Sequence, residues 1–256
     1  MADIASLLGD APPGEIDAVK QDILEITQKS NSVEKALEIQ AGKSNVEQLR
    51  LVTVAGKQTV VSEFNHIEEN YFYTHGSKPV KFEINHLSRE TKVDGDYDKE
   101  VSSKVLEIQS EIEEYLEAHY CAESVGCVFG DDDKQHVVII GRKLSPQNFF
   151  NGQTTAVYTV ANDNVDGTIK ADVHYFEEGN VRLKSSNNIS AKVTRSVMKT
   201  IASEESQFEN MLNQSLRALN DTEFKQIRRQ LPVTRQPVDW VQAIAGYNVG
   251  KDLGNR

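Results

Sequence analysis

The sequence predicts an α+β protein in which an antiparallel β-meander is preceded by helices and covered by a long helix. Apolar residues recur at three- and four-residue steps near the N-terminus, and from Val125 onward they alternate with polar residues. Residues 191–219 then contain neither glycine nor proline, which favours one long helix. The expected regions are an N-terminal helical stalk (1–48), a small mixed region with a helix (49–118), an antiparallel sheet (119–190), a long helix across the sheet (191–222) and an amphipathic tail (223–256).

Two short helices are expected in the stalk. Pro12 and Pro13, followed by the acidic Glu15, favour a helix start at this point. The first helix carries its apolar residues on one face: Ile16, Val19, Ile23 and Ile26. The second continues the pattern with three further residues: Val33, Leu37 and Ala41. We expect it to end at Gly42, and short helices this close together indicate a small antiparallel bundle.

The mixed region is expected to contain short strands followed by a helix. Strand-like runs span 51–54, 59–61 and 80–84. The helical period returns between 100 and 118, where the apolar residues form one stripe: Val101, Val105, Ile108, Ile112 and Leu116.

The sheet region is expected to hold five strands separated by short turns. The candidates are Val125–Phe129, His136–Lys143, Thr154–Val160, Thr168–Phe176 and Asn180–Ser185. Turn-forming residues gather between them at 130–133, 162–167 and 177–180. Apolar and polar residues alternate cleanly within 168–176, which predicts an antiparallel meander with one covered face.

The long helix is expected to supply that cover. Its apolar residues lie on one side: Val197, Ile201, Phe208, Leu212 and Leu219. At 1.5 Å per residue the segment forms a rod of about 43 Å. Such a helix is long enough to cross a whole sheet or to reach a second subunit.

The tail has the pattern of a docking arm. Pro232 and Pro237 interrupt any continuous helix, and the segment after them carries Trp240, Ile244 and Tyr247 at i, i+4 and i+7. An isolated helix of about 15 residues is marginal in water, whereas burial of each such side chain contributes about 1.5–3 kcal/mol. We therefore expect the tail to order fully only against another surface.

Charge is distributed unevenly along the chain. There are 28 basic and 39 acidic residues, a formal net charge of −11. From Phe224 onward there are six basic and two acidic residues, a net +4, so the preceding residues carry 22 basic and 37 acidic ones, a net −15. An acidic body repels nucleic acid, which is not an expected partner. The cationic tail is expected either to bind an acidic partner or to fold back onto the acidic body.

No pattern of a catalytic or metal site is found, so neither an enzyme nor a bound cofactor is expected. The sequence lacks a nucleophile elbow, a metalloprotease helix and a dinucleotide-binding glycine pattern. Asp94, Asp96 and Asp98 have the spacing of a calcium loop. However, Lys99 occupies the position that requires glycine, and Val105 the position that requires a bidentate glutamate.

Cysteine content and hydropathy indicate a soluble chain in a reducing compartment. Cys121 and Cys127 are too few for a disulfide scaffold and have no histidines at zinc-finger spacing, so both are expected to be small buried or half-buried side chains. The longest aliphatic run, 137–140, is far shorter than the roughly 20 residues of a membrane helix. The first residues also lack the basic and apolar stretches of a signal peptide.

The run FKQIRRQLPVTR at 224–235, followed by Asp239 and Trp240, resembles the C-terminal signature of the F-actin capping protein alpha subunit family. Three further segments match the family at corresponding places along the chain: Ala11–Glu15, Asn148–Gly152 and Val173–Val181. The resemblance runs nearly from end to end. Its tail motif is highly specific, because eight consecutive residues such as RRQLPVTR rarely recur by chance.

The resemblance implies a non-catalytic subunit that caps the barbed end of actin filaments independently of calcium and blocks subunit addition and loss. It implies one half of an intertwined, pseudo-symmetric heterodimer with a capping protein beta subunit, in which a C-terminal tentacle binds the filament. It also implies a location in the cytoplasm, with the cortical actin cytoskeleton. One alternative stays open, namely a capping subunit of a short actin-related filament within a dynactin-like assembly.

The resemblance and the tail pattern together assign the actin-binding residues: Lys225, Arg228, Arg229, Arg235, Trp240, Ile244 and Tyr247. Two of the basic residues, Lys225 and Arg229, are also implied to meet phosphoinositide headgroups. Arg228 has an alternative partner in the acidic body, and Trp240 has an alternative role as an anchor of the tail on the sheet. Relatives often carry a lysine within 236–238, where this chain has none.

Overall fold

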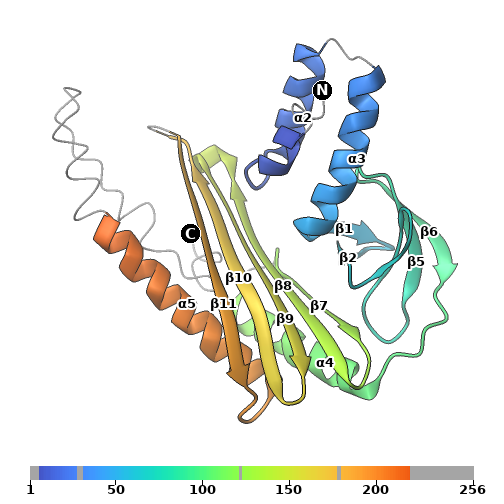
Figure 1. The fold of residues 1–256 in the computed structure, drawn as a ribbon, viewed down its shortest axis with the longest axis vertical. Coiled ribbons are helices and arrows are strands. Elements are labelled where there is room, and N and C mark those ends of the chain that lie inside the picture. The colour runs from blue at the N-terminus through green and yellow to red at the C-terminus, as the bar shows by residue number, and fades with distance from the viewer. Residues whose placement is uncertain (1–5, 28–30, 121–122, 178–179, 220–256) are drawn as a thin grey trace.

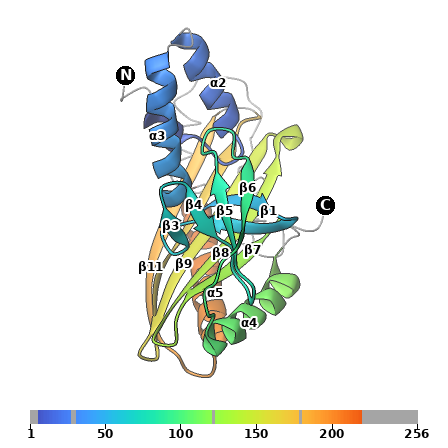
Figure 2. The same cartoon turned by 90° about the vertical axis from the view of Figure 1, so that its right-hand side faces the viewer.

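The structure, a computed structural model, describes residues 6–27, 31–120, 123–177 and 180–219 (Figure 1). A five-stranded sheet lies between two helices on one face and two small sheets on the other. A pair of N-terminal helices projects beyond one end of this sheet (Figures 1 and 2). The predicted α+β class with antiparallel sheets and a long helix is confirmed.

The N-terminal helices have their own small core. A 3-10 turn at Leu7–Asp10 precedes α2 (Ile16–Ile26) and α3 (Asn31–Glu47). The core joins all three elements: Leu8, Ala11, Ile16, Ile23, Leu37 and Ala41. Ile26 was predicted on the same face as Ile23, but it is 77% exposed, because it ends α2 beyond the reach of this core.

The predicted end of the second helix at Gly42 is wrong, because α3 continues to Glu47. A Cβ atom on Gly42 would lie 3.4 Å from Cδ2 of His86. The His86 ring packs against α3 at Gly42, and the glycine lies within the helix without ending it.

Two small sheets and a helix form the mixed region. Strands β1 (Arg50–Val54) and β2 (Lys57–Val61) pair with each other, and β3 (His66–Glu68), β4 (Tyr71–Tyr73), β5 (Val80–Ile84) and β6 (Thr91–Asp96) form the second sheet. The three predicted runs are confirmed in β1, β2 and β5, while β3, β4 and β6 were not predicted because they are short or almost wholly exposed. Helix α4 (Ser103–His119) is also confirmed, and Ser102 caps it by accepting a hydrogen bond from the Val105 amide.

The large sheet is a meander with strand order β11-β10-β9-β8-β7. Its strands are β7 (Val125–Gly130), β8 (Lys134–Ser145), β9 (Phe150–Ala161), β10 (Asn164–Tyr175) and β11 (Val181–Lys192). All five predicted strands are confirmed, and all are longer than expected, β7 by a single residue.

The turn predicted at 162–167 is much shorter in the structure. Only Asn162 and Asp163 connect β9 to β10, and both have positive φ values of 51° and 60°, as in a two-residue hairpin turn. Val165 is fully buried and pairs with Val160 and Ala191. Asparagine and aspartate inside a strand were therefore mistaken for a longer loop.

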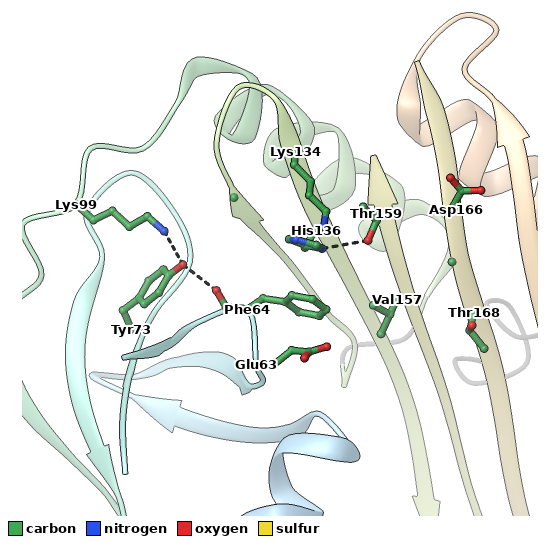
Figure 3. A pocket seen from close by; sticks show the side chains of 12 residues that line it. Glu63, Phe64, Tyr73, Lys99, Lys134, His136, Val157, Thr159, Asp166 and Thr168 are labelled. Atoms are coloured by element: carbon green, nitrogen blue, oxygen red, sulfur yellow. Dashed lines mark hydrogen bonds between the residues drawn. The ribbon is translucent and has the colours of Figure 1, made fainter. Parts of the chain in front are cut away.

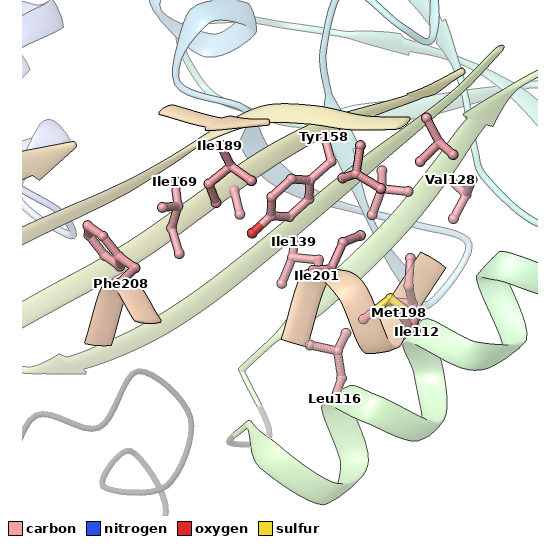
Figure 4. Close-up of a cluster of buried hydrophobic side chains, with 14 of the residues drawn as sticks. Ile112, Leu116, Val128, Ile139, Tyr158, Ile169, Ile189, Met198, Ile201 and Phe208 are labelled. Atoms are coloured by element: carbon pink, nitrogen blue, oxygen red, sulfur yellow. The ribbon is translucent and has the colours of Figure 1, made fainter. Parts of the chain in front are cut away.

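Helix α5 (Val197–Leu219) covers one face of the large sheet together with α4 (Figure 1). It starts six residues later than predicted, because residues 191–192 complete β11. Met198 and Ile201 of α5 pack with Ile112 of α4 over Tyr158 of the sheet (Figure 4). The predicted stripe is confirmed at Ile201, Phe208 and Leu212, which are all buried, while Val197 is half-buried.

The opposite face of the large sheet is only partly covered. The small sheets pack on β7 and β8 through a second cluster: Leu49, Val60, Tyr73, Val125, Cys127, Phe129, Val138 and Ile140. No such cluster extends to the same face of β10 and β11 among the described residues. We call this uncovered part of β9, β10 and β11 the lower face.

Candidate functional site

All seven predicted actin-binding residues, Lys225, Arg228, Arg229, Arg235, Trp240, Ile244 and Tyr247, lie outside the described residues. The described chain ends at Leu219, the last residue of α5. The structure does describe the body that precedes the tail. Its candidate functional features are the edge of β11, the lower face of the sheet, and the side-chain contacts that hold α5 and the N-terminal segment on the sheet.

The three shorter segments of the family resemblance meet at the carboxylate of Glu15. Glu15 Oε1 accepts hydrogen bonds from Nδ2 of Asn151 at 3.0 Å and from Nδ1 of His174 at 2.6 Å. Nε2 of His174 lies 2.7 Å from Oδ1 of Asn180. Residues up to 165 positions apart in the sequence thus join α2 to the ends of β9, β10 and β11. The sequence analysis missed this junction.

Arg182 makes a second attachment between the N-terminal segment and the sheet. Its Nε and Nη2 atoms donate to the two carboxylate oxygens of Asp172 at 2.9 and 2.7 Å. The same guanidinium also donates to the backbone carbonyl oxygens of Asp10 and Ala11. Because a bidentate pair fixes the plane of the guanidinium, the start of the chain is held at a defined position on the sheet.

We predict that Glu15→Ala destabilises the fold by about 1–3 kcal/mol. The substitution leaves His174 and Asn151, both almost fully buried, without their shared acceptor. Urea unfolding followed by circular dichroism measures the change, and Asp22→Ala on an exposed position of the same helix is the matched control. Equal effects of the two substitutions would contradict the role of the junction.

The outer strand of the large sheet, β11, has a free edge within the described part of the chain. It pairs with β10 along all twelve residues, from Asn164 opposite Lys192 to Tyr175 opposite Val181, and with no other described strand. A long edge with unpaired backbone groups is a template for pairing with another strand. Its exposed side chains on the lower face are polar: Lys184, Ser186, Asn188 and Ser190.

A buried carboxylate fixes the position of α5. Glu205 Oε2 accepts hydrogen bonds from the hydroxyls of Tyr115 and Tyr120, both at 2.8 Å, and Oε1 accepts one from Tyr158 at 3.2 Å. Burial raises the pKa of Glu205 above its ordinary value, although the three hydrogen bonds act in the opposite direction. The sequence analysis missed this residue, which lies four positions after Ile201 in the apolar stripe and is only 2% exposed.

Two adjoining cavities lie along the lower face. One, of about 680 Å³, is shown in Figure 3, where Lys99 donates to the Tyr73 hydroxyl at 2.8 Å and Tyr73 donates to the Phe64 carbonyl oxygen at 3.0 Å. The other, of about 570 Å³, lies toward the N-terminal helices. Val157 and Thr168 line both, so the cavities form one groove.

The buried thiol of Cys127 is poorly suited to nucleophilic attack. Cys127 lies beneath the small sheets with its Sγ atom 3.2 Å from Nδ1 of His75, but burial raises the pKa of its thiol to about 12. A thiol that stays protonated at neutral pH is a poor nucleophile. The expectation of a buried side chain is confirmed for Cys127, while Cys121 lies outside the described residues.

Neither a metal centre nor a membrane-spanning helix is found in the part of the chain that the structure describes. Its histidine, cysteine, aspartate and glutamate side chains form no group of three that could hold a metal ion. Asp94 and Asp96, which have calcium-loop spacing in the sequence, lie on β6, where Asp94 pairs with Lys81 at 3.3 Å. No described helix is both long and apolar enough to cross a bilayer.

Comparison with known proteins gives a consistent result. The family model for the F-actin capping protein alpha subunit matches residues 4–252. The F-actin-capping protein subunit alpha of Yarrowia lipolytica is 34% identical, with 98% of this chain and 94% of that protein covered, and the Saccharomyces cerevisiae protein of the same name is 31% identical, with 97% and 95% covered. A solved structure of the homodimeric actin capping protein alpha subunit from Plasmodium berghei has a TM-score of 0.67 at 17% identity, covering 90% of this chain and 96% of that one.

Proposed function

Since the chain belongs to the F-actin capping protein alpha subunit family, we propose that it caps the barbed end of actin filaments as one half of a heterodimer with a capping protein beta subunit. The dimer blocks both addition and loss of actin subunits. The observation that carries this proposal is the match over residues 4–252, which includes the body and almost the whole tail.

The free edge of β11 supports the dimeric part of the proposal. A second subunit of similar fold can continue the sheet by pairing along this edge, which would cover its unpaired backbone groups. Helix α5 lies across the same part of the sheet and can contact that subunit. Co-expression with candidate beta subunits followed by size-exclusion chromatography tests this, and a stable homodimer without any beta subunit would contradict it.

The tail, residues 223–256, is proposed as the arm that binds the filament. Its net charge, +4 from Phe224 onward, favours encounter with an acidic surface, and its apolar stripe, Trp240, Ile244 and Tyr247, then slows dissociation. Lys225 and Arg229 are proposed to bind phosphoinositide headgroups with the same charges. This would place lipid and filament in competition for one segment.

Elongation of actin from filament seeds tests the proposed function. The purified heterodimer should stop growth at barbed ends to the same extent with calcium or with a calcium chelator, because Asp94 and Asp96 lie on strand β6 and Asp94 pairs with Lys81. A requirement for calcium would contradict this part of the proposal. Co-purification of an actin-related protein, with no effect on actin growth, would instead favour the dynactin-like alternative.

We predict that Arg229→Ala combined with Arg235→Ala weakens capping about tenfold at low salt. Two exposed ion pairs of about 0.7 kcal/mol each correspond to a factor of ten in affinity. Salt screens such pairs, so the difference should shrink at 0.3 M salt. Seeded elongation measures the effect. The control, Arg195→Ala with Lys199→Ala, removes two exposed cations from the body. Equal weakening of capping by this control would contradict a specific role of the tail cations.

A further inference from the structure

Arg50, the first residue of β1, is a buried cation for which the described residues provide no carboxylate partner. It is 8% exposed, its Nε atom is buried without a hydrogen bond, and Nη2 reaches only Oε1 of Gln48, at 3.5 Å. Burial and the nearby charges of Arg89 and Arg142 lower the pKa of Arg50 to about 10. The carboxylate of Asp17 opposes this effect from a distance, but it already pairs with Arg89 and Lys20.

A buried charge is costly unless an opposite charge compensates it. Arg50 lies in the wall of the cavity of about 570 Å³ at the upper end of the groove. This cavity is bounded by the start of the chain (Gly9–Pro13), by the end of α3 and β1, and by the lower face of the large sheet. An anion that enters this cavity can therefore reach Arg50 and compensate its charge.

The floor of the cavity adds further hydrogen-bond donors. Thr155, Lys170 and Ser186 lie side by side on β9, β10 and β11 in the observed register. Lys170 is exposed and makes no ion pair with a described residue. Thr155 accepts a hydrogen bond from Nε2 of Gln153 at 3.1 Å, which leaves its hydroxyl proton available for a ligand.

The charge of this cavity is opposite to that of the chain. Its lining carries four cations, Arg50, Lys170, Arg182 and Lys184, and two carboxylates, Glu47 and Asp172. The local net charge is +2 in a chain of net charge −11. Arg182 already holds Asp172, and Lys184 pairs with Asp10 at 3.6 Å, so Arg50 and Lys170 are the cations that remain for a ligand.

We propose that this cavity binds the phosphate group of a small solute, with Arg50 and Lys170 as its charged contacts and Thr155 and Ser186 as neutral donors. Guanidinium, ammonium and hydroxyl donors that line one cavity suit the several oxygens of a phosphate better than the two oxygens of a carboxylate. The site is built from residues outside the tail segment, and the proposal does not depend on the proposed capping function. Inorganic phosphate and a phosphorylated solute such as a nucleotide share this chemistry.

The test is a binding titration of the co-purified dimer with three probes: inorganic phosphate, pyrophosphate and ATP without metal. Thermal unfolding is recorded at constant ionic strength, with chloride as the reference anion. We expect a saturable rise of the melting temperature with at least one probe. Saturation by inorganic phosphate identifies a site for a single phosphate group, whereas saturation by pyrophosphate or ATP alone identifies a larger phosphorylated solute.

Substitutions then locate the site. Arg50→Gln and Lys170→Gln should each raise the dissociation constant of the effective probe at least tenfold, while Lys192→Gln, at an exposed position at the end of β11, should leave it unchanged. Equilibrium dialysis with the labelled probe measures the same constants without reference to stability. Absence of saturable binding, or binding that persists in both variants, overturns the proposal. If no probe raises the melting temperature and Arg50→Gln weakens dimerisation, the anion that compensates Arg50 belongs to the partner subunit. This result would also overturn the proposal.

Discussion

Deletion of residues 224–256 should raise the concentration of heterodimer that halves barbed-end growth by at least about a thousandfold. The deletion removes six of the chain's basic residues and the apolar stripe of Trp240, Ile244 and Tyr247. At a minimum of about 1.5 kcal/mol for each of the three side chains, the loss is about 4.5 kcal/mol, and each 1.4 kcal/mol corresponds to a factor of ten in affinity. The lost charges also slow encounter with the filament.

The deletion leaves every described helix and strand intact, since all of them end at or before Leu219, so we expect it to separate binding from folding. The shortened chain should still co-purify with its partner subunit and should keep the unfolding transition of the full-length complex. Seeded elongation over a wide range of protein concentrations gives the measurement. A shortened dimer that stops growth at the same concentration as the full-length dimer would place the filament-binding surface on the body and would refute the assignment of the tail.

Local periodicity accounts for the elements that could be predicted. Ile16 and Ile23 identified α2, and Ile201, Phe208 and Leu212 identified the buried side of α5, because each set follows one period within one segment. The errors concern residues whose secondary structure is decided by tertiary contacts and not by their own local propensity. Gly42 lies inside α3, which continues to Glu47 with His86 packed against it, and Val165 lies inside β10 because two strands pair with it.

The described parts of the site depend on contacts that no local pattern reveals. Glu15 and His174 are 159 positions apart, and Tyr115 and Glu205 are 90 positions apart. The resemblance did identify the segments that contain Glu15, Asn151 and His174, but not the fact that they meet. Arg50 gave no signal at all, because a single arginine at the start of a strand looks like an ordinary surface residue until its burial is known.

Glu205→Ala should lower the free energy of unfolding by about 3 kcal/mol or more. The substitution leaves the hydroxyls of Tyr115, Tyr120 and Tyr158 without their common acceptor, and each unsatisfied buried hydroxyl costs about 1–3 kcal/mol. These tyrosines lie on α4, beside its end and on β9, so their loss of contact loosens α5 from both. Urea unfolding of the dimer at neutral pH measures the change.

Glu205→Gln should remove a specific pH dependence while it retains the size of the side chain. Because burial raises the pKa of Glu205 in the folded chain above 4.5, the folded state binds more protons than the unfolded state between the two values. The stability contributed by this group is therefore complete below pH 4.5 and falls as the pH rises to the folded pKa. A difference of one pH unit between the two pKa values corresponds to about 1.4 kcal/mol.

The difference in unfolding free energy between the native chain and Glu205→Gln, measured from pH 4 to pH 8, isolates this group from the other acids. As the pH rises, the native chain should lose stability relative to the glutamine variant, until the pH exceeds the pKa of Glu205 in the folded chain. Above that pH the difference should be constant. Glu204→Gln, at the neighbouring and more exposed position of α5, is the control for the loss of one carboxylate from this helix. A flat difference for Glu205→Gln would mean that the three tyrosine hydrogen bonds offset the burial of the carboxylate, so that Glu205 anchors α5 as an ordinary ionised group.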